Sequence, residues 1–189
     1  MNTILDRLSG GDLRSDGAAD QAAEAVLQHP ALIGDLVTGL DSPEAVIRGR
    51  TADALEKIAR SRPDLTIGHL PLLLSLLKED TVPMVRMHLA MMLGHFTEYS
   101  EYVDTIIPAL LQALDETRVF TKSWAIVSLC IYARNYPRYW EEIAKKIAEL
   151  STNPSKAIQT KVRYAMEVLS DDEIQFPKGW VRSKRDLLD

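Results

Sequence analysis

A repeat of about 37 residues constrains the fold of this chain more than any other feature. Leucines that close apolar runs recur at intervals of 37, 37 and 36 residues, at Leu40, Leu77, Leu114 and Leu150. Four basic residues recur in step with them and each opens a helical stretch, namely Arg48, Arg86, Lys122 and Lys161. Repetition with a period of roughly 20–50 residues is typical of solenoids and other repeat architectures.

The spacing inside each repeat is that of a helix face. Four and seven residues after each basic marker comes a small or apolar residue, giving the pairs Ala52 and Leu55, Ala90 and Leu93, Ile126 and Leu129, and Ala165 and Val168. Each repeat is therefore predicted to be a helix, a short turn and a second helix. The first helices are expected at 30–40, 65–77, 101–114 and 137–150, and the second at 44–60, 83–97, 118–134 and 155–169. No alternating run bounded by hairpin turns indicates a strand.

These motifs resemble HEAT repeats. Ile47-Arg48 with Ala52 and Leu55, and Val85-Arg86 with Ala90 and Leu93, are similar to the second helix of that family. The resemblance covers about residues 12–169 and implies an all-α, right-handed α-solenoid that serves as a partner-binding scaffold. Lys122 and Lys161 depart from it, because arginine is typical at those positions. Tetratricopeptide repeats have a period of about 34 residues and a tryptophan–leucine–glycine–tyrosine pattern, which no copy here shows.

We expect a single solenoid domain over residues 1–189. Its parts are an N-terminal capping copy at 1–28 with Arg14 and Ala18 at the marker positions, repeats at 29–61, 62–98, 99–135 and 136–169, and a capping tail at 170–189.

The recurring basic residues invite two interpretations. They could form a ladder for an anionic ligand. In the family that the chain resembles, however, this position is structural and reaches the turn aspartate of its own or the neighbouring repeat. Asp41, Asp80 and Asp115 lie six or seven residues before Arg48, Arg86 and Lys122. We therefore expect a structural ladder that comprises Arg48, Arg86, Lys122, Lys161, Asp41, Asp80 and Asp115.

Composition excludes several classes of protein. The chain has 189 residues, 46% of them hydrophobic, so it is not intrinsically disordered. Its formal net charge of −5 argues against a dedicated nucleic-acid binder. A single cysteine, Cys130, allows no disulfide within the chain. The first residues lack the apolar run of a secretory signal and no window is apolar enough to span a membrane, so we expect a cytoplasmic protein.

No catalytic motif stands out. There is no glycine-rich phosphate loop after a strand and no helical zinc-protease motif. His88 and His95, seven apart on the expected second helix, lie too far apart to chelate one metal, so we expect no metal and no cofactor. Cys130 sits between Leu129 and Ile131 on an apolar helix, which favours a buried inert thiol over a nucleophile.

One enzymatic alternative rests on a further resemblance. Residues 120–129 are similar to a repeat helix of the HEAT-like alkylpurine DNA glycosylases, with Trp124 as a candidate aromatic. Those enzymes require an aspartate near their tryptophans, and the position one turn after Trp124 is Ser128. Glycosylase activity or nucleic-acid binding through the basic fourth repeat is therefore the alternative function.

Helical geometry predicts which residues of the second helices oppose the core. Positions two, five and nine after each marker point away from it, since a helix turns about 100° per residue. In the first full repeat they are polar (Arg50, Asp53 and Lys57) and predict ordinary solvated surface. In the next two repeats they form a more apolar set, expected to bind a partner: His88, Met91, His95, Trp124, Val127 and Ile131. Exposed apolar patches mark interfaces, although tight curvature or the tail could also cover these residues.

The tail and the charge distribution complete the prediction. Residues 134–163 hold seven basic and three acidic residues, whereas residues 1–133 hold 11 and 18. Such a bipolar surface favours a charged partner or self-association. Phe176 and Trp180 are expected to fold back onto the fourth helix pair, because the last repeat needs a cap. A further-reaching tail would lay Trp180 against Trp124. The function expected is a non-enzymatic scaffold for a protein or peptide partner.

Overall fold

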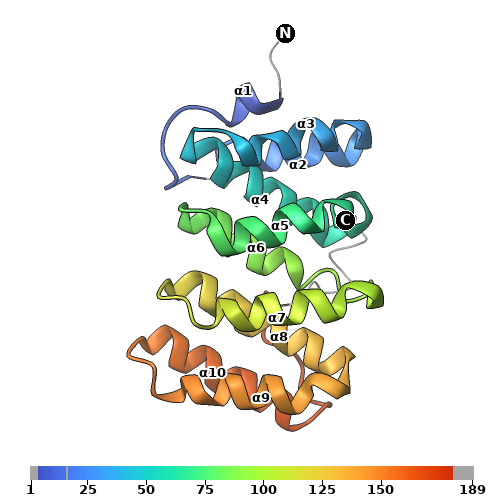
Figure 1. The fold of residues 1–189 in the computed structure, drawn as a ribbon. Coiled ribbons are helices and arrows are strands. Elements are labelled where there is room, and N and C mark those ends of the chain that lie inside the picture. Colours follow the sequence, from blue (N-terminus) through green and yellow to red (C-terminus); the bar gives the residue numbers. More distant parts are fainter. Residues whose placement is uncertain (1–3, 16, 181–189) are drawn as a thin grey trace. The chain divides into compact units, whose positions relative to one another are not determined.

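The computed structural model describes residues 4–15 and 17–180, and every regular element in these ranges is helical. Ten α-helices are joined by turns and short 3₁₀-helices, with no strand among the described residues (Figure 1). Contacts divide the chain into two compact units, Met1–Met92 and Leu93–Asp189. The all-α class and the repeated helix pairs predicted from the sequence are confirmed.

In the N-terminal unit, helix α4 is central. The helices are α1 (Ile4–Leu8), α2 (Ala19–Gln28), α3 (Ile33–Val37), α4 (Ala45–Ser61), α5 (Leu70–Glu79) and α6 (Pro83–Leu93), the last of which ends one residue into the next unit. Helix α4 packs against α1, α2 and α3. Its buried residues, among them Leu55 and Ile58, form the core of this unit together with buried residues of α2 and α3 such as Val26 and Leu36.

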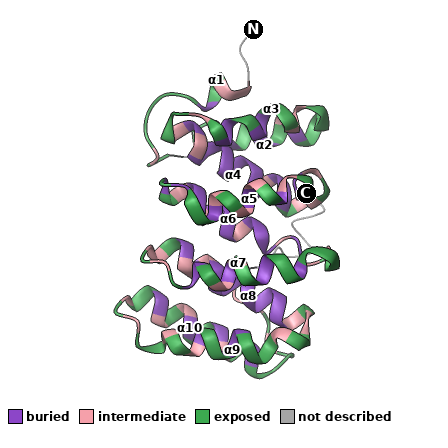
Figure 2. Cartoon of the chain, viewed as in Figure 1, coloured by how far each residue is buried: buried purple, intermediate pink, exposed green. Residues whose placement is uncertain are grey.

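In the C-terminal unit, helix α8 is the central helix, as α4 is in the N-terminal unit. The helices are α7 (Val103–Ala113), α8 (Val119–Asn135), α9 (Trp140–Ala148) and α10 (Lys156–Ser170). Helix α8 packs against α7, α9 and α10, and its residues from Ala125 to Ala133 are all buried (Figure 2). The phenol of Tyr132 is buried as well and donates to the carbonyl of Leu93 at 2.9 Å.

Two local devices repeat along the chain. Three of the first helices open with a 3₁₀ turn that begins at a proline, at Pro30, Pro63 and Pro137, where the missing N–H costs nothing. Before three of the second helices, a side-chain oxygen accepts a hydrogen bond from the backbone N–H two residues later. The acceptors are Ser42, Asp80 and Asn153.

The predicted register is confirmed, because the eight apolar markers of the second helices are at most 2% exposed. Two local predictions were wrong. Helix α6 ends at Leu93 and not at residue 97, since Gly94 follows and glycine is a poor helix former. His95 therefore lies in a turn and does not share a helix with His88. Arg14 also lies in a turn, 91% exposed, so it opens no helix.

Candidate functional site

The clearest candidate site lies on the face of α8 and α10 in the C-terminal unit. Lys161, on α10, places its ammonium 5.2 Å from the ring centre of Trp124 on α8 and 4.8 Å from that of Trp180 in the tail. Both contacts are within the range of cation–π attraction. Trp124 is half-buried, and Trp180 is buried, with 6% of its surface exposed.

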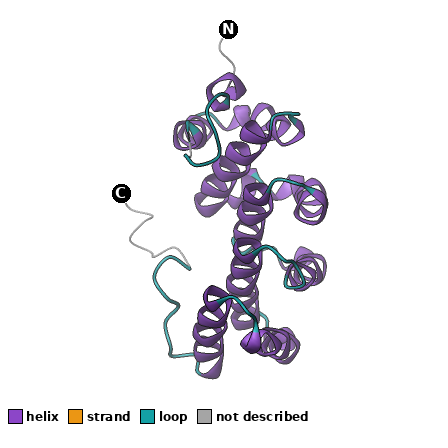
Figure 3. Cartoon of the chain, turned by 90° about the vertical axis from the view of Figure 1, so that its left-hand side faces the viewer, coloured by secondary structure: helices purple, strands orange, loops and turns teal. Residues whose placement is uncertain are grey.

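The segment 171–180 follows α10 and turns back along the unit (Figure 3). Arg134, near the end of α8, binds the main chain of this segment. Its guanidinium donates to the carbonyls of Val168 at 2.8 Å, Asp171 at 2.8 Å and Ile174 at 2.6 Å. The same group lies 5.1 Å from the ring centre of Phe176. One arginine thus fixes the chain where it leaves the last helix.

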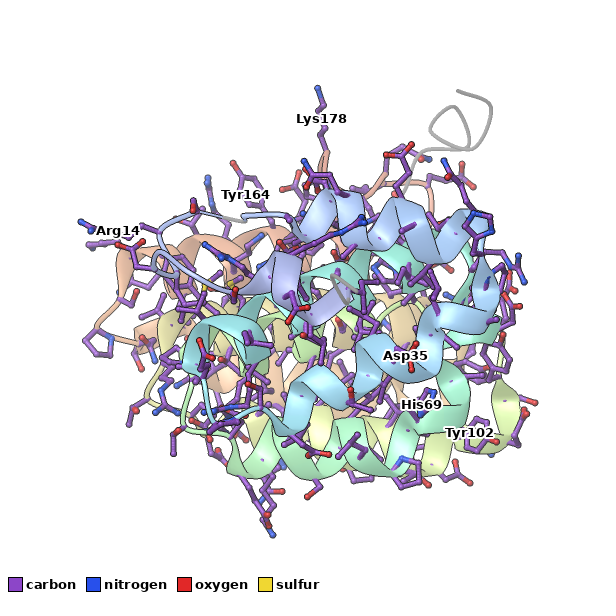
Figure 4. All side chains as sticks on the ribbon, turned by 90° about the horizontal axis from the view of Figure 1, so that it is seen from above. Arg14, Asp35, His69, Tyr102, Tyr164 and Lys178 are labelled. Atoms are coloured by element: carbon purple, nitrogen blue, oxygen red, sulfur yellow. The ribbon has the colours of Figure 1, made fainter. Side chains whose placement is uncertain are left out.

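A pocket of about 520 Å³ opens between α10 and this segment. Its lining residues are Lys156, Ala157, Thr160, Lys161, Tyr164, Pro177, Lys178 and Trp180. Tyr164 is partly exposed, and Lys178 reaches into solvent at the edge of the unit (Figure 4).

Burial shifts the pKa values of two groups at this face, Lys161 and Cys130. Desolvation lowers the pKa of Lys161 below the ordinary lysine value. Desolvation also raises the pKa of the Cys130 thiol to about 12, although the positive charges of Arg134 and Lys161 oppose that shift. Cys130 is fully buried, so it is a protonated, unreactive thiol at neutral pH, as its apolar helix suggests.

A second polar cluster lies in the N-terminal unit, between α4 and α6. Asp53, Glu56 and His88 are all buried and bring potential metal-ligand atoms within 4.8 Å of one another. The carboxylates already have cationic partners, because Lys57 bonds Asp53 at 3.0 Å and Arg60 bonds Glu56 at 2.5 Å. A metal ion would have to displace both partners, and we interpret the cluster as an ion-pair network.

Lys57 lies at the edge of that network and has a second acid, Asp20 on α2, at 2.5 Å. Desolvation alone would lower its pKa, but the hydrogen bonds to Asp20 and Asp53 outweigh that effect and the net pKa is raised. His88 lies 3.8 Å from Asp53, measured from Nδ1 to a carboxylate oxygen.

The predicted partner-binding residues differ in exposure. His88, Val127 and Ile131 are buried, with 7%, 1% and 8% of their surfaces exposed, so the expectation that they form an open surface was wrong. The reason at Val127 and Ile131 is that α8 is packed on three sides by helices of its own unit. Met91, His95 and Trp124 are half-buried and remain candidates for contact.

The solvated surface predicted for the first full repeat is also wrong. Arg50 is only 5% exposed and Asp53 is equally buried. The guanidinium of Arg50 donates to the carbonyls of Leu8 at 2.9 Å, Gly10 at 2.7 Å and Asp12 at 3.1 Å. The N-terminal loop therefore covers this arginine, which no periodic pattern could reveal.

The ladder residues occupy different environments. Arg48 pairs with Asp80 of the following repeat at 3.1 Å and donates to the carbonyl of Ser42 at 2.8 Å. Arg86 donates to the carbonyl of Leu77 at 2.6 Å. Lys122 is half-buried, and Asp41 and Asp115 are exposed. Lys161 differs from the arginines, since its ammonium faces two indole rings.

Sequence reasoning did not identify Arg134 as a binding residue. The only signal was its position, at the end of the second helix that precedes the last repeat, where it can reach the carbonyls that α10 leaves unbonded.

A comparison with protein families identifies the family of the chain. A family model described as HEAT repeats matches residues 33–130, more than half of the chain. The chain belongs to the HEAT-repeat family. The resemblance inferred from the repeat markers is therefore confirmed, and the HEAT-repeat chain is a repeat scaffold in its architecture.

Solved structures support the same fold. The HEAT-repeat chain is similar to two crystal structures of engineered proteins from the Northeast Structural Genomics Consortium. One is 19% identical with a TM-score of 0.62, covering 88% of this chain and 78% of the other. The second is 21% identical with a TM-score of 0.63, covering 88% and 79%. At these identities the likeness concerns the fold alone. A search of curated proteins found no match.

In the part of the chain that the structure describes, no helix combines the length and the apolar character needed to cross a bilayer.

Proposed function

We propose that this HEAT-repeat chain is a non-enzymatic scaffold that binds a peptide or protein segment along the face of its second helices. One observation carries the proposal: the face of α8 and α10 already holds a non-helical stretch of polypeptide, the chain's own segment 171–180, which includes turns at 171–174 and 177–180. The segment is held by main-chain bonds to Arg134 and by aromatic contacts at Phe176 and Trp180. Solenoids use such extended faces to bind partners.

The environments of the reactive side chains favour a binding role over catalysis. The Cys130 thiol is buried and its pKa is about 12, so it cannot act as a thiolate near neutral pH. The carboxylates of Asp53 and Glu56 are bonded to Lys57 and Arg60. A free buried thiol also fits a reducing compartment, and we propose the cytoplasm as the location.

The glycosylase alternative has less support. It needs a carboxylate beside Trp124, whereas the residue one helical turn later is the buried Ser128 and the charged group over the ring is the Lys161 ammonium. No specific contact favours nucleic acid over a peptide.

The test of the scaffold proposal is partner capture with point variants. Trp124→Ala removes a half-buried aromatic side chain from the proposed binding face, whereas Phe120→Ala removes the 69% exposed aromatic at the start of the same helix. We expect Trp124→Ala to lose proteins that the wild type and Phe120→Ala both retain, as measured by quantitative mass spectrometry after affinity capture. Circular dichroism checks that both variants fold. Equal recovery of every protein by all three forms would contradict the proposal.

A further inference from the structure

The pocket between α10 and the segment 171–180 combines lysine side chains with apolar wall. Its volume of about 520 Å³ falls in the range of ordinary ligand sites, roughly 300–1,000 Å³. Three lysines line it, at positions 156, 161 and 178, and none of its described lining residues is acidic. Ala157, Pro177 and the indole of Trp180 provide apolar wall.

Lys161 is the residue that indicates an anionic ligand, because its positive charge lacks a nearby carboxylate among the described residues. It is half-buried, and within the described residues no carboxylate lies within ion-pair distance of its ammonium. Its neighbours are the rings of Trp124 and Trp180, at 5.2 Å and 4.8 Å. No counter-charge from the described residues compensates this partly desolvated cation, so an anion that reaches it gains more than at an open surface.

Lys57 is the matched comparison within the same chain. It too is a partly buried lysine on a second helix, but Asp20 and Asp53 contact its ammonium at 2.5 Å and 3.0 Å. The two lysines consequently have pKa values displaced in opposite directions, raised for Lys57 and lowered for Lys161. The protein supplies the counter-charge itself at Lys57, and at Lys161 a ligand can supply it.

We propose that this pocket recognises an acidic residue of the bound segment, with its carboxylate on the Lys161 ammonium and an adjoining apolar side chain against Pro177 and Trp180. This inference rests on the proposed scaffold function and names the chemistry of the partner. The chain's own segment offers a precedent on the same face, since the carboxylate of Asp172 lies 3.4 Å from Nε of Arg134. The pocket has one half-buried ammonium and a short apolar wall, which suit a single carboxylate and its neighbouring side chain, whereas a nucleic-acid strand is bound along a groove that contacts several phosphates.

The experiment uses the full chain and the indole N–H signals of its three tryptophans in nuclear magnetic resonance spectra. The probe is the acetylated, amidated peptide Leu-Glu-Asp-Leu, and its neutral isostere Leu-Gln-Asn-Leu is the control. We expect the acidic peptide to shift the signals of Trp124 and Trp180 in a saturable way. The signal of Trp140 should stay in place, because its indole nitrogen donates to the carbonyl of Leu169 outside the pocket, at 3.1 Å.

Lys161→Met keeps the length and apolar stem of the side chain and removes only the charge. We expect it to weaken binding of the acidic peptide at least tenfold without lowering the melting temperature. Lys145→Met, an exposed lysine on α9, makes the same charge change away from the pocket and should leave affinity within twofold.

The remaining outcomes overturn the inference in separable ways. Equal affinity for the acidic and neutral peptides, or unchanged affinity in Lys161→Met, removes the acidic-residue site. Inorganic phosphate that shifts the same signals as strongly as the peptide shows a simple anion site. Binding of a thymidine oligonucleotide that Lys161→Met abolishes assigns the pocket to nucleic acid. If partners are lost from Trp124→Ala but not from Lys161→Met, the scaffold function stands and this inference fails.

Discussion

At the scale of single residues, two arginines hold the segments near the two ends of the described chain; Arg50 is buried and Arg134 is partly buried. Arg50 collects carbonyls from the loop after α1, and Arg134 collects carbonyls from the segment after α10. Gly17 belongs to the N-terminal arrangement. It has a φ of +56°, and a Cβ built on it would lie 2.4 Å from Cζ of Arg50. A left-handed backbone and a close approach both require glycine there.

We predict that Gly17→Ala lowers stability by about 1–2 kcal/mol, the cost of a left-handed conformation for an L-residue, with more if Arg50 is displaced. In a chain of this size that is a fall in melting temperature of about 2–8 °C. Gly34→Ala is the control, because nothing lies within 4 Å of its added Cβ and Gly34 is helical. It should raise stability by about 0.4–1 kcal/mol. Calorimetric shifts of the same sign in both variants would contradict the account of Gly17.

At the scale of elements, the segment 171–180 acts as a packed part of the C-terminal unit. Trp180 is buried, Phe176 lies on Arg134, and the segment forms one wall of the pocket beside α10. The main-chain bonds of Arg134 add to these contacts in holding the segment in place.

Deletion of residues 173–189 is predicted to lower the melting temperature by a few degrees, since it exposes the apolar surface under Trp180. Trp180→Ala in the full chain should reproduce a large part of the loss. Both forms should bind the acidic peptide more weakly, because they lack one pocket wall. Tighter binding after deletion would instead show that the tail inhibits the site, and an unchanged melting temperature would exclude a capping role.

The helix pairs could be predicted from the sequence because their markers are periodic and local. The residues four and seven positions after each basic marker, such as Ala52, Leu55, Ile126 and Leu129, are buried in every copy. The candidate site could be predicted only in part. Trp124 and Trp180 were singled out, but Val127 was expected to be open and Arg134 was overlooked. Val127 is covered because α7, α9 and α10 pack around α8, and Arg50 is covered by the loop after α1; the spacing of the repeat markers describes neither arrangement.

At the scale of the whole molecule, charge is distributed unevenly along the chain. Residues 134–163 carry an excess of four positive charges, whereas residues 1–133 carry an excess of seven negative charges. The positive stretch includes Lys156 and Lys161 of the pocket. An acidic partner is attracted to this part of the chain and repelled by the rest, and this favours a single orientation of binding.

The affinity for the acidic peptide should depend only weakly on salt concentration, because the site recognises one or two carboxylates. We predict that the logarithm of the association constant for the acidic peptide falls with the logarithm of salt concentration with a slope of about −1 to −2. A protein that neutralises several phosphates of single-stranded nucleic acid would show about −0.7 per phosphate. Titration calorimetry between low and high sodium chloride measures the slope. A value of about −4 or steeper would contradict a site that recognises one or two carboxylates.

The way in which Arg134 binds the tail has a consequence for how such a chain can evolve. Its hydrogen bonds go to carbonyl oxygens, which every amino acid carries, so the arginine recognises the course of the main chain and is indifferent to most of the side chains. Mutations can therefore accumulate at 171–174 while the hydrogen bonds from Arg134 to the main chain persist. For the same reason, a foreign segment grafted after α10 would be bound by Arg134 through its first carbonyl groups, whatever its side chains.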